Sequence, residues 1–134
     1  MTTPGGVRRA DVELRLPADG AYASVLRTTT AGLAARLDFT IDDIEDLRIA
    51  ASEASALVLP EADDGTDLLC RFWLDPGELV LSLTVSSSNP SAPDEDGFAW
   101  QVLSTLASEV TSDVGADSFT LRLTMRPESA ATSG

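Results

Sequence analysis

One acidic side chain stands out as a candidate for chemistry: Glu53, in the apolar second half of a segment that reads IDDIEDLRIAASEASALVLP. The chain has no histidine and one cysteine, so the groups available for acid–base or nucleophilic chemistry are carboxylates, hydroxyls and a single thiol. Glu53 is therefore a candidate for a functional carboxylate. It is also explained as an ordinary carboxylate at the rim of a helix bundle, in which case Leu57, four residues further on, belongs to the core.

Two acidic runs raise the question of a metal site. Neither Asp63 to Asp67 nor Asp94 to Asp96 has the alternating acids and the bidentate glutamate of a calcium loop, so no metal site is expected. The serines from Ser86 to Ser88 have no histidine or glycine elbow to activate them, and the segment is interpreted as a loop. Cys70 is interpreted as a small buried strand residue.

The charge of the chain limits its partners. It carries 22 Asp and Glu against 9 Lys and Arg, for a net charge of −13 over 134 residues. Such a chain is repelled by nucleic-acid backbones and by anionic membranes, so neither is an expected partner. A basic protein fits this charge, although acidity that serves only solubility explains it equally well.

Alternating apolar and polar residues predict four strands, and apolar residues at helical spacing predict three helices, in the order β-α-α-β-β-α-β. The strands are expected at residues 12–16, 68–74, 79–85 and 119–126. The helices are expected at residues 21–37, 41–60 and 98–110. The sequence Asp75-Pro76-Gly77-Glu78 predicts the turn of a β-hairpin.

This pattern defines an α/β fold with two layers. Strands with one apolar face require helices on that face, so we expect a mixed, mostly antiparallel sheet of about four strands with three helices on one face. The expected organisation is a flexible arm at residues 1–10, one domain at 11–126 and a disordered tail at 127–134. Because no apolar block follows the N-terminus and there is one cysteine, a cytoplasmic location is expected.

The order of elements and two stretches of sequence resemble the RsbW-like anti-sigma factors. The stretches are Leu16-Pro17-Ala18, which leads into a helix containing Tyr22, and FTIDDIEDLRIAASEA from Phe39 to Ala54. The resemblance extends from about Val12 to Met125. The family comprises small serine-protein kinases with the fold of the gyrase and histidine-kinase (GHKL) ATPases, so the resemblance implies that fold.

The resemblance also assigns roles on the second helix. In the family, the glutamate of this motif orients the attacking nucleophile, and an asparagine four residues later holds the Mg²⁺ on the nucleotide phosphates. Glu53 matches the glutamate, whereas Leu57 stands at the position of the Mg²⁺ ligand. A leucine cannot coordinate a hard cation, which requires oxygen ligands. Glu53 is then a vestigial catalytic acid.

Two further nucleotide-binding elements depart from the family pattern. The family's Asp-x-Gly-x-Gly, whose aspartate reads the adenine, is replaced by SSSNP at residues 86–90, which include Ser87. The glycine-rich lid over the phosphates is reduced to DGFAW at residues 96–100, which keep Gly97. A degenerate ATP site is therefore expected, with no bound cofactor, and Mg-ATP binding is the alternative. Its expected members are Glu53, Leu57, Ser87 and Gly97.

The three departures together, and the run GFAWQVL at residues 97–103, resemble a diverged actinobacterial subgroup of anti-sigma factors. The resemblance implies a cytoplasmic anti-sigma factor of a stress response. It would sequester an alternative sigma factor and be released by an anti-anti-sigma (STAS) protein. The family's sigma factors dock mainly on the first helix, which here offers Tyr22, Ser24, Arg27 and Thr28.

Two other functions remain open from the sequence. One is an active ATP-dependent protein-serine kinase that phosphorylates a STAS protein, and the other is a scaffold of this fold with an unrelated partner. A homodimer is also expected, because the family pairs through a two-fold interface. We expect an uncovered apolar patch around Val80, between Leu68 and Trp73, to support that pairing.

Overall fold

The computed structural model describes residues 8–127, and residues 1–7 and 128–134 lie outside it. Most of the expected arm and tail falls on those outer residues. The described helices are α1 (Ala23–Arg36), α2 (Ile41–Val58) and α3 (Phe98–Leu106), with short 3-10 turns at η1 (Gly20–Tyr22) and η2 (Leu59–Glu61). The described strands are β1 (Val12–Pro17), β2 (Asp67–Asp75), β3 (Glu78–Ser86), β4 (Glu109–Val114) and β5 (Ser118–Met125).

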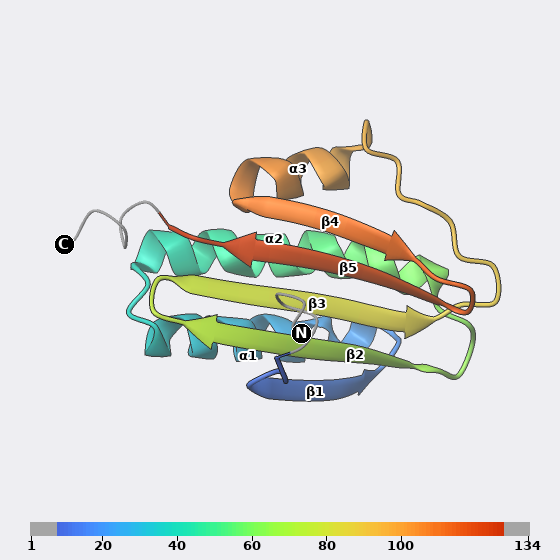
Figure 1. The fold of residues 1–134 in the computed structure, drawn as a ribbon, viewed down its shortest axis with the longest axis horizontal. Coiled ribbons are helices and arrows are strands. Elements are labelled where there is room, and N and C mark those ends of the chain that lie inside the picture. The colour runs from blue at the N-terminus through green and yellow to red at the C-terminus, as the bar shows by residue number, and fades with distance from the viewer. Residues whose placement is uncertain (1–7, 128–134) are drawn as a thin grey trace.

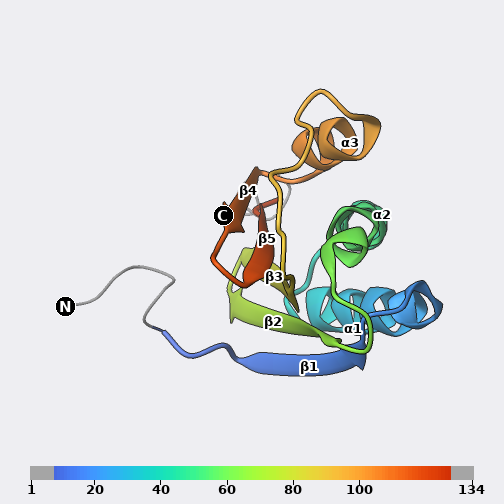
Figure 2. The same cartoon turned by 90° about the vertical axis from the view of Figure 1, so that its right-hand side faces the viewer.

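The strands form one sheet in the order β1-β2-β3-β5-β4, and the three helices cover one of its faces (Figure 1). Seen along the sheet, α2 lies between α1 and α3, and the opposite face of the sheet carries none of the described helices (Figure 2). The predicted two-layer sandwich is confirmed. Two details were wrong: the sheet has five strands, and all four described pairings are antiparallel.

The strand that the sequence did not reveal is β4. The third helix ends at Leu106 and not at Val110, because the next residue, Ala107, is already extended. The backbone then pairs with β5, with Val110 opposite Leu123. β4 reads EVTSDV, and its two apolar residues lie at opposite ends of a polar strand. Such a strand at the edge of a sheet has little hydrophobic periodicity to detect.

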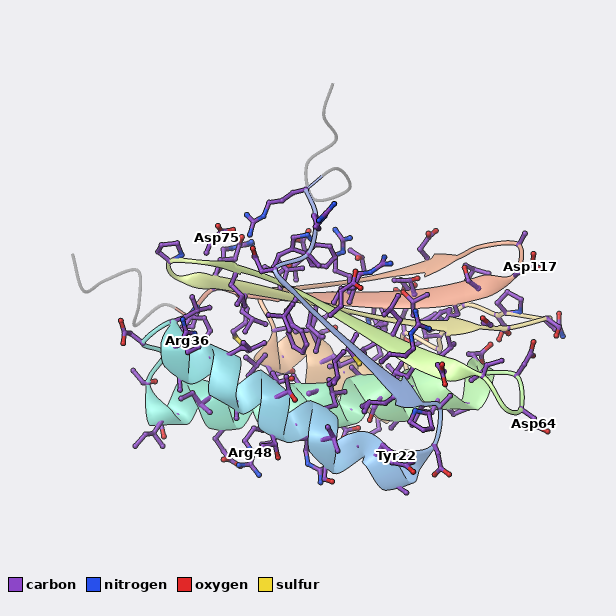
Figure 3. All side chains as sticks on the ribbon, turned by 90° about the horizontal axis from the view of Figure 1, so that it is seen from below. Tyr22, Arg36, Arg48, Asp64, Asp75 and Asp117 are labelled. Carbon is purple, nitrogen blue, oxygen red and sulfur yellow. The ribbon has the colours of Figure 1, made fainter. Side chains whose placement is uncertain are left out.

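The core lies between the sheet and the helices (Figure 3). Strands β1, β2, β3 and β5 contribute buried residues to it, mostly alternate ones as the period of two requires, and Phe72 and Phe119 are the largest fully buried side chains among the described residues. Leu47, Ala51, Ala54 and Val58 of α2 face them. Small alanines let this helix pack closely against the sheet. Cys70 is buried as expected, and its burial raises the pKa of the thiol to about 12.

The two long helices are joined by a tight, well-capped connection. The backbone N–H groups of Asp38 and Phe39 donate to the carbonyls of Ala35 and Ala34 at 3.1 and 3.2 Å, which is the Schellman pattern at the end of α1. Asp38 has φ of 62° at the position where glycine is usual. The hydroxyl of Thr40 then accepts from the N–H of Asp43 at 3.1 Å and caps α2.

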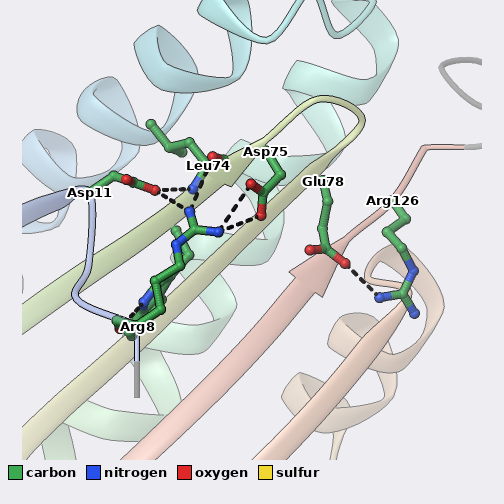
Figure 4. A network of polar contacts seen from close by, with 7 residues as sticks. Arg8, Asp11, Leu74, Asp75, Glu78 and Arg126 are labelled. Carbon is green, nitrogen blue, oxygen red and sulfur yellow. Dashed lines mark hydrogen bonds and ion pairs between the residues drawn. The ribbon is translucent and has the colours of Figure 1, made fainter. Parts of the chain in front are cut away.

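The β2–β3 hairpin has the expected turn, in which Gly77 has φ of 76°. Arg8, which precedes β1, forms hydrogen bonds at the hairpin end of the sheet (Figure 4). Arg8 donates to both oxygens of Asp75 at 3.0 and 2.9 Å and to Asp11 at 2.6 Å, and Asp11 also accepts from the N–H of Leu74 at 2.7 Å. Arg8 and Asp11, just before β1, are therefore bonded to the end of β2.

Candidate functional site

The two residues of the expected catalytic motif lie one turn apart on α2. Glu53 and Leu57 are both half-buried. Leu57 packs against the hydrophobic core. A side chain in that position contributes apolar contact, and it offers no oxygen to a cation. The residues that surround Glu53 on its helix are small, since Ala50 and Ala54 are buried alanines.

The segment after β3 is held by carboxylates that precede β2. Ser87 is buried, and its N–H donates to the carbonyl of Asp117 at 2.9 Å. Ser88 donates twice to Asp63, from its N–H at 3.0 Å and from its hydroxyl at 2.6 Å. These hydrogen bonds favour the charged carboxylate and lower the pKa of Asp63. Ser91 donates from its N–H to Glu61 at 3.0 Å.

These contacts were missed at the level of sequence, which indicated only an acidic loop. Asp63 and Glu61 are separated from Ser88 and Ser91 by 25 and 30 positions, and no local pattern joins them. Asp64 and Asp117 mark this end of the molecule, opposite Arg36 and Asp75 (Figure 3). Among residues 8–127, no three His, Cys, Asp or Glu side chains gather in a way that would hold a metal ion.

Gly97 lies at the start of α3 and belongs to an acidic turn. Its N–H donates to the carbonyl of Asp94 at 3.0 Å, and a Cβ at this position would lie 3.1 Å from the same oxygen. Asp94 also accepts from the N–H of Asp96 at 2.9 Å. The turn is thus organised by its own carboxylate. Three consecutive acids at this place disfavour the approach of a polyphosphate.

The four residues expected at a degenerate ATP site therefore lie on separate elements. Glu53 and Leu57 share α2, while Ser87 follows β3 and Gly97 begins α3. The hydrogen bonds of Ser87 and Gly97 go to Asp117 and Asp94, and neither bond reaches α2. Of the four, only the spacing of Glu53 and Leu57 is fixed by a single helix. That the four form the remains of a nucleotide site stays a prediction.

The expected partner surface is the outer side of α1. Tyr22, just before α1, is 42% exposed, and Ser24 and Thr28 are also exposed. Val25 of α1 is 40% exposed and adds apolar area to this surface. Arg27 is half-buried and donates to the hydroxyl of Ser52 at 3.3 Å, next to Glu53 in the sequence.

The fold and these positions define a class. An antiparallel sheet with three helices on one face, and a long second helix that carries Glu53, is the arrangement expected for the histidine-kinase-like (GHKL) ATPase fold. A solved structure of the RsbU and RsbW domains of Rv1364c from Mycobacterium tuberculosis matches it with a TM-score of 0.61 and 21% sequence identity. The match covers 86% of this chain and 32% of that one, and it shows the fold.

Sequence comparison points to one group within that class. The chain is 43% identical over 72 residues to the serine-protein kinases RsbW of Bacillus thuringiensis and Bacillus cereus. These matches cover 52% of this chain and 45% of each relative, so the chain spans under half the length of the relatives that it matches. RsbW of Bacillus velezensis is 49% identical over 43 residues, 32% of this chain and 27% of that one. No protein-family model matches. The resemblance to RsbW is confirmed.

None of the helices in the described part of the chain is long and apolar enough to cross a membrane.

Proposed function

We propose that the chain is an anti-sigma factor that binds an alternative sigma factor and is released by an anti-anti-sigma protein of the STAS type. The observation that carries the proposal is Leu57. It stands one turn after Glu53 in a chain that resembles RsbW, and it packs against the core where a Mg²⁺ ligand is required. A protein of this kind keeps the means to bind its partners while it has lost nucleotide binding.

The segments around α3 support the same loss. Ser87 stands where the family reads the adenine, and it is buried with its N–H bonded to Asp117. The turn before α3 keeps one glycine and presents Asp94, Glu95 and Asp96. Each of these changes removes contacts to a different part of the nucleotide. Restoring one of the lost residues therefore leaves the other two defects in place.

The sigma factor is proposed to dock on α1. Tyr22 and Val25 provide exposed apolar area, and Ser24 and Thr28 provide hydrogen-bonding groups around it. Sigma factors carry basic surfaces because they meet DNA, so a chain with a net charge of −13 attracts them. We place this function in the cytoplasm, as part of a stress response.

The chain is further proposed to form a homodimer through the face of the sheet that has no helix. Trp73, Val80 and Leu69 are half-buried there, and Arg122 lies over the Trp73 ring with its guanidinium carbon 5.1 Å from the ring centre. Leu68, which the sequence analysis placed beside Val80, points into the core instead and is 2% exposed.

Two measurements test the proposal. Calorimetric titration with Mg-ATP should give no binding tighter than about 10 μM, which corresponds to about 7 kcal/mol. When the alternative sigma factors of the host are mixed one at a time with the purified protein, at least one of them should form a stable complex. The double variant Tyr22→Ala, Val25→Ser should weaken that complex. Transfer of phosphate from ATP to a STAS protein would support the protein-serine kinase alternative, with Glu53 as the base. Absence of any sigma-factor complex would favour an unrelated partner.

A further inference from the structure

A groove of about 380 Å³ lies between α2 and α3. It is lined by one residue of α2, Ile49, and by five of α3: Phe98, Gln101, Val102, Thr105 and Leu106. Phe98 is 80% exposed and Ile49 is 41% exposed. A large aromatic side chain left in solvent at the mouth of an apolar groove is unusual for a side chain that serves only the core.

The polar side chains of the groove have their hydrogen-bond donors engaged. The amide nitrogen of Gln101 donates to the carbonyl of Glu95 at 2.7 Å, and the hydroxyl of Thr105 donates to the carbonyl of Gln101 at 2.9 Å. Sites for small ligands need a few polar groups that converge on the ligand. This groove instead offers a strip of apolar surface, which suits the apolar face of another protein element.

Carboxylates flank the strip on α2 and precede it on α3. Glu45 and Glu53 lie one helical turn before and after Ile49 on α2, and residues at this spacing share a helix face. On the α3 side, Gln101 donates to the backbone carbonyl of Glu95, which belongs to the acidic turn that precedes Phe98. The helical half of the chain is strongly acidic as a whole, because residues 18–66 and 87–108 contain 13 Asp and Glu and 3 Arg. The rim therefore complements a basic partner.

Other occupants fit less well. A second copy would bring the same acidic rim against this one, which costs free energy at ordinary salt. The end segments of the chain, MTTPGGV at residues 1–7 and ESAATSG at 128–134, contain no apolar residues at helical spacing that could fill the groove.

We propose that the groove between α2 and α3 binds an amphipathic, basic helix of a partner protein. Such a helix places apolar residues at positions i, i+3 or i+4, and i+7 into the groove, and its lysines and arginines meet the carboxylates of the rim. The groove is distinct from the α1 surface, because α2 lies between α1 and α3 (Figure 2). The proposal does not depend on whether a sigma factor binds α1.

A model peptide tests the groove directly. The probe is a fluorescein-labelled peptide of leucine and lysine, about 14 residues or four turns long, with leucine at helical spacing. Fluorescence anisotropy should show binding to the unaltered protein. Phe98→Ser and Ile49→Ser should each weaken it at least about tenfold, since each removes a central apolar contact. Val114→Ser, at an exposed apolar residue of β4, should leave it unchanged, and circular dichroism should show that all three variants are folded.

A peptide of the same composition with scrambled order separates apolar docking from simple charge attraction. It should bind much more weakly, while Glu45→Lys should weaken binding of the ordered peptide. Equal binding of the ordered and scrambled peptides, or equal binding by all the variants, would overturn the proposal. It would also fail if Phe98→Ser converted a dimer of this chain to a monomer, because the groove would then be covered by a second copy.

Discussion

The carboxylate of Asp63 accepts both the N–H and the hydroxyl of Ser88, at 3.0 and 2.6 Å. One exposed acid thereby fixes the start of the long segment between β3 and α3. The segment leads to the acidic turn and to Phe98. Its anchoring therefore affects both the expected degenerate ATP site and the proposed binding groove between α2 and α3. Because Asp63 is a titratable group, this contact should also make the free energy of unfolding depend on pH in the acid range.

Replacing Asp63 with alanine should lower the free energy of unfolding at pH 7, and the difference should shrink in acid. The pKa of Asp63 is lowered from its ordinary value of 3.8 by the hydrogen bonds from Ser88, so the carboxylate stabilises the fold above the ordinary pKa. That contribution is lost as the pH falls through the lowered pKa. Urea unfolding at pH 7 and at successively lower pH values measures it. Asp64→Ala is the matched control, and an equal loss in both variants would contradict the assignment.

Replacing Leu57 with asparagine should destabilise the protein by about 1–3 kcal/mol, because a polar amide replaces a leucine packed on the core. The same variant should still fail to bind Mg-ATP, since Ser87 and the acidic turn are unchanged. Ala56→Asn, at the exposed neighbouring position, should cost less. Tight ATP binding by Leu57→Asn would show that the site had lost a single element only.

If the proposed sigma-factor partner binds, association with it should slow tenfold or more as salt rises from about 50 to about 500 mM, because charge steering is screened over about 8 Å at physiological salt. Dissociation should change much less. Asp38→Asn with Asp42→Asn, near the first helix, should slow association at low salt, and Glu109→Gln on β4 should not. Stopped-flow mixing at each salt concentration measures the association rate. An association rate that does not change with salt would indicate that the acidity serves solubility alone.

Light scattering at micromolar concentration should give twice the chain mass of 14.1 kDa. Val80→Lys places a charge on the proposed interface and should give a monomer. Ile41→Lys, at an 84% exposed position on the helical side, should remain a dimer. A monomer from the unaltered protein would end the dimer proposal.

Asp38→Gly should stabilise the protein by about 0.5–1 kcal/mol. Asp38 has φ of 62°, a conformation that glycine adopts without the steric cost of a Cβ. The N–H groups that close the Schellman motif are unaffected by the change. Asp42→Gly should act in the opposite direction, because it places glycine in the first turn of α2 and removes a favourable charge. Thermal unfolding of both variants tests the pair.

Much of this fold follows from local sequence. The alternation in β3 and β5 and the Pro76-Gly77 turn each have a local physical cause, and each is confirmed. Which face of α1 is buried was harder to predict, because the helix is rich in alanine and threonine, which leaves its apolar stripe poorly defined. The bonds of Asp63 and Glu61 were missed because they depend on the approach of segments far apart in the chain.

The candidate site was predictable to a similar extent. Glu53 and Leu57 lie where the helical spacing placed them, one turn apart, and the packing of Leu57 follows from its apolar side chain. The groove between α2 and α3 was not predictable. Its shape depends on where α3 ends and on how α3 packs against α2. The predicted helix continued to Val110, whereas α3 ends at Leu106.

The polarity that concealed β4 has a second consequence. β4 is the last strand of the sheet, so one side of its backbone has no neighbouring strand within the described residues. A hydrophobic strand in that position would recruit other chains and seed fibrils. Glu109 and Asp113 on β4 are exposed, and their repulsion discourages such stacking. The polar composition of this outer strand therefore disfavours aggregation of the chain.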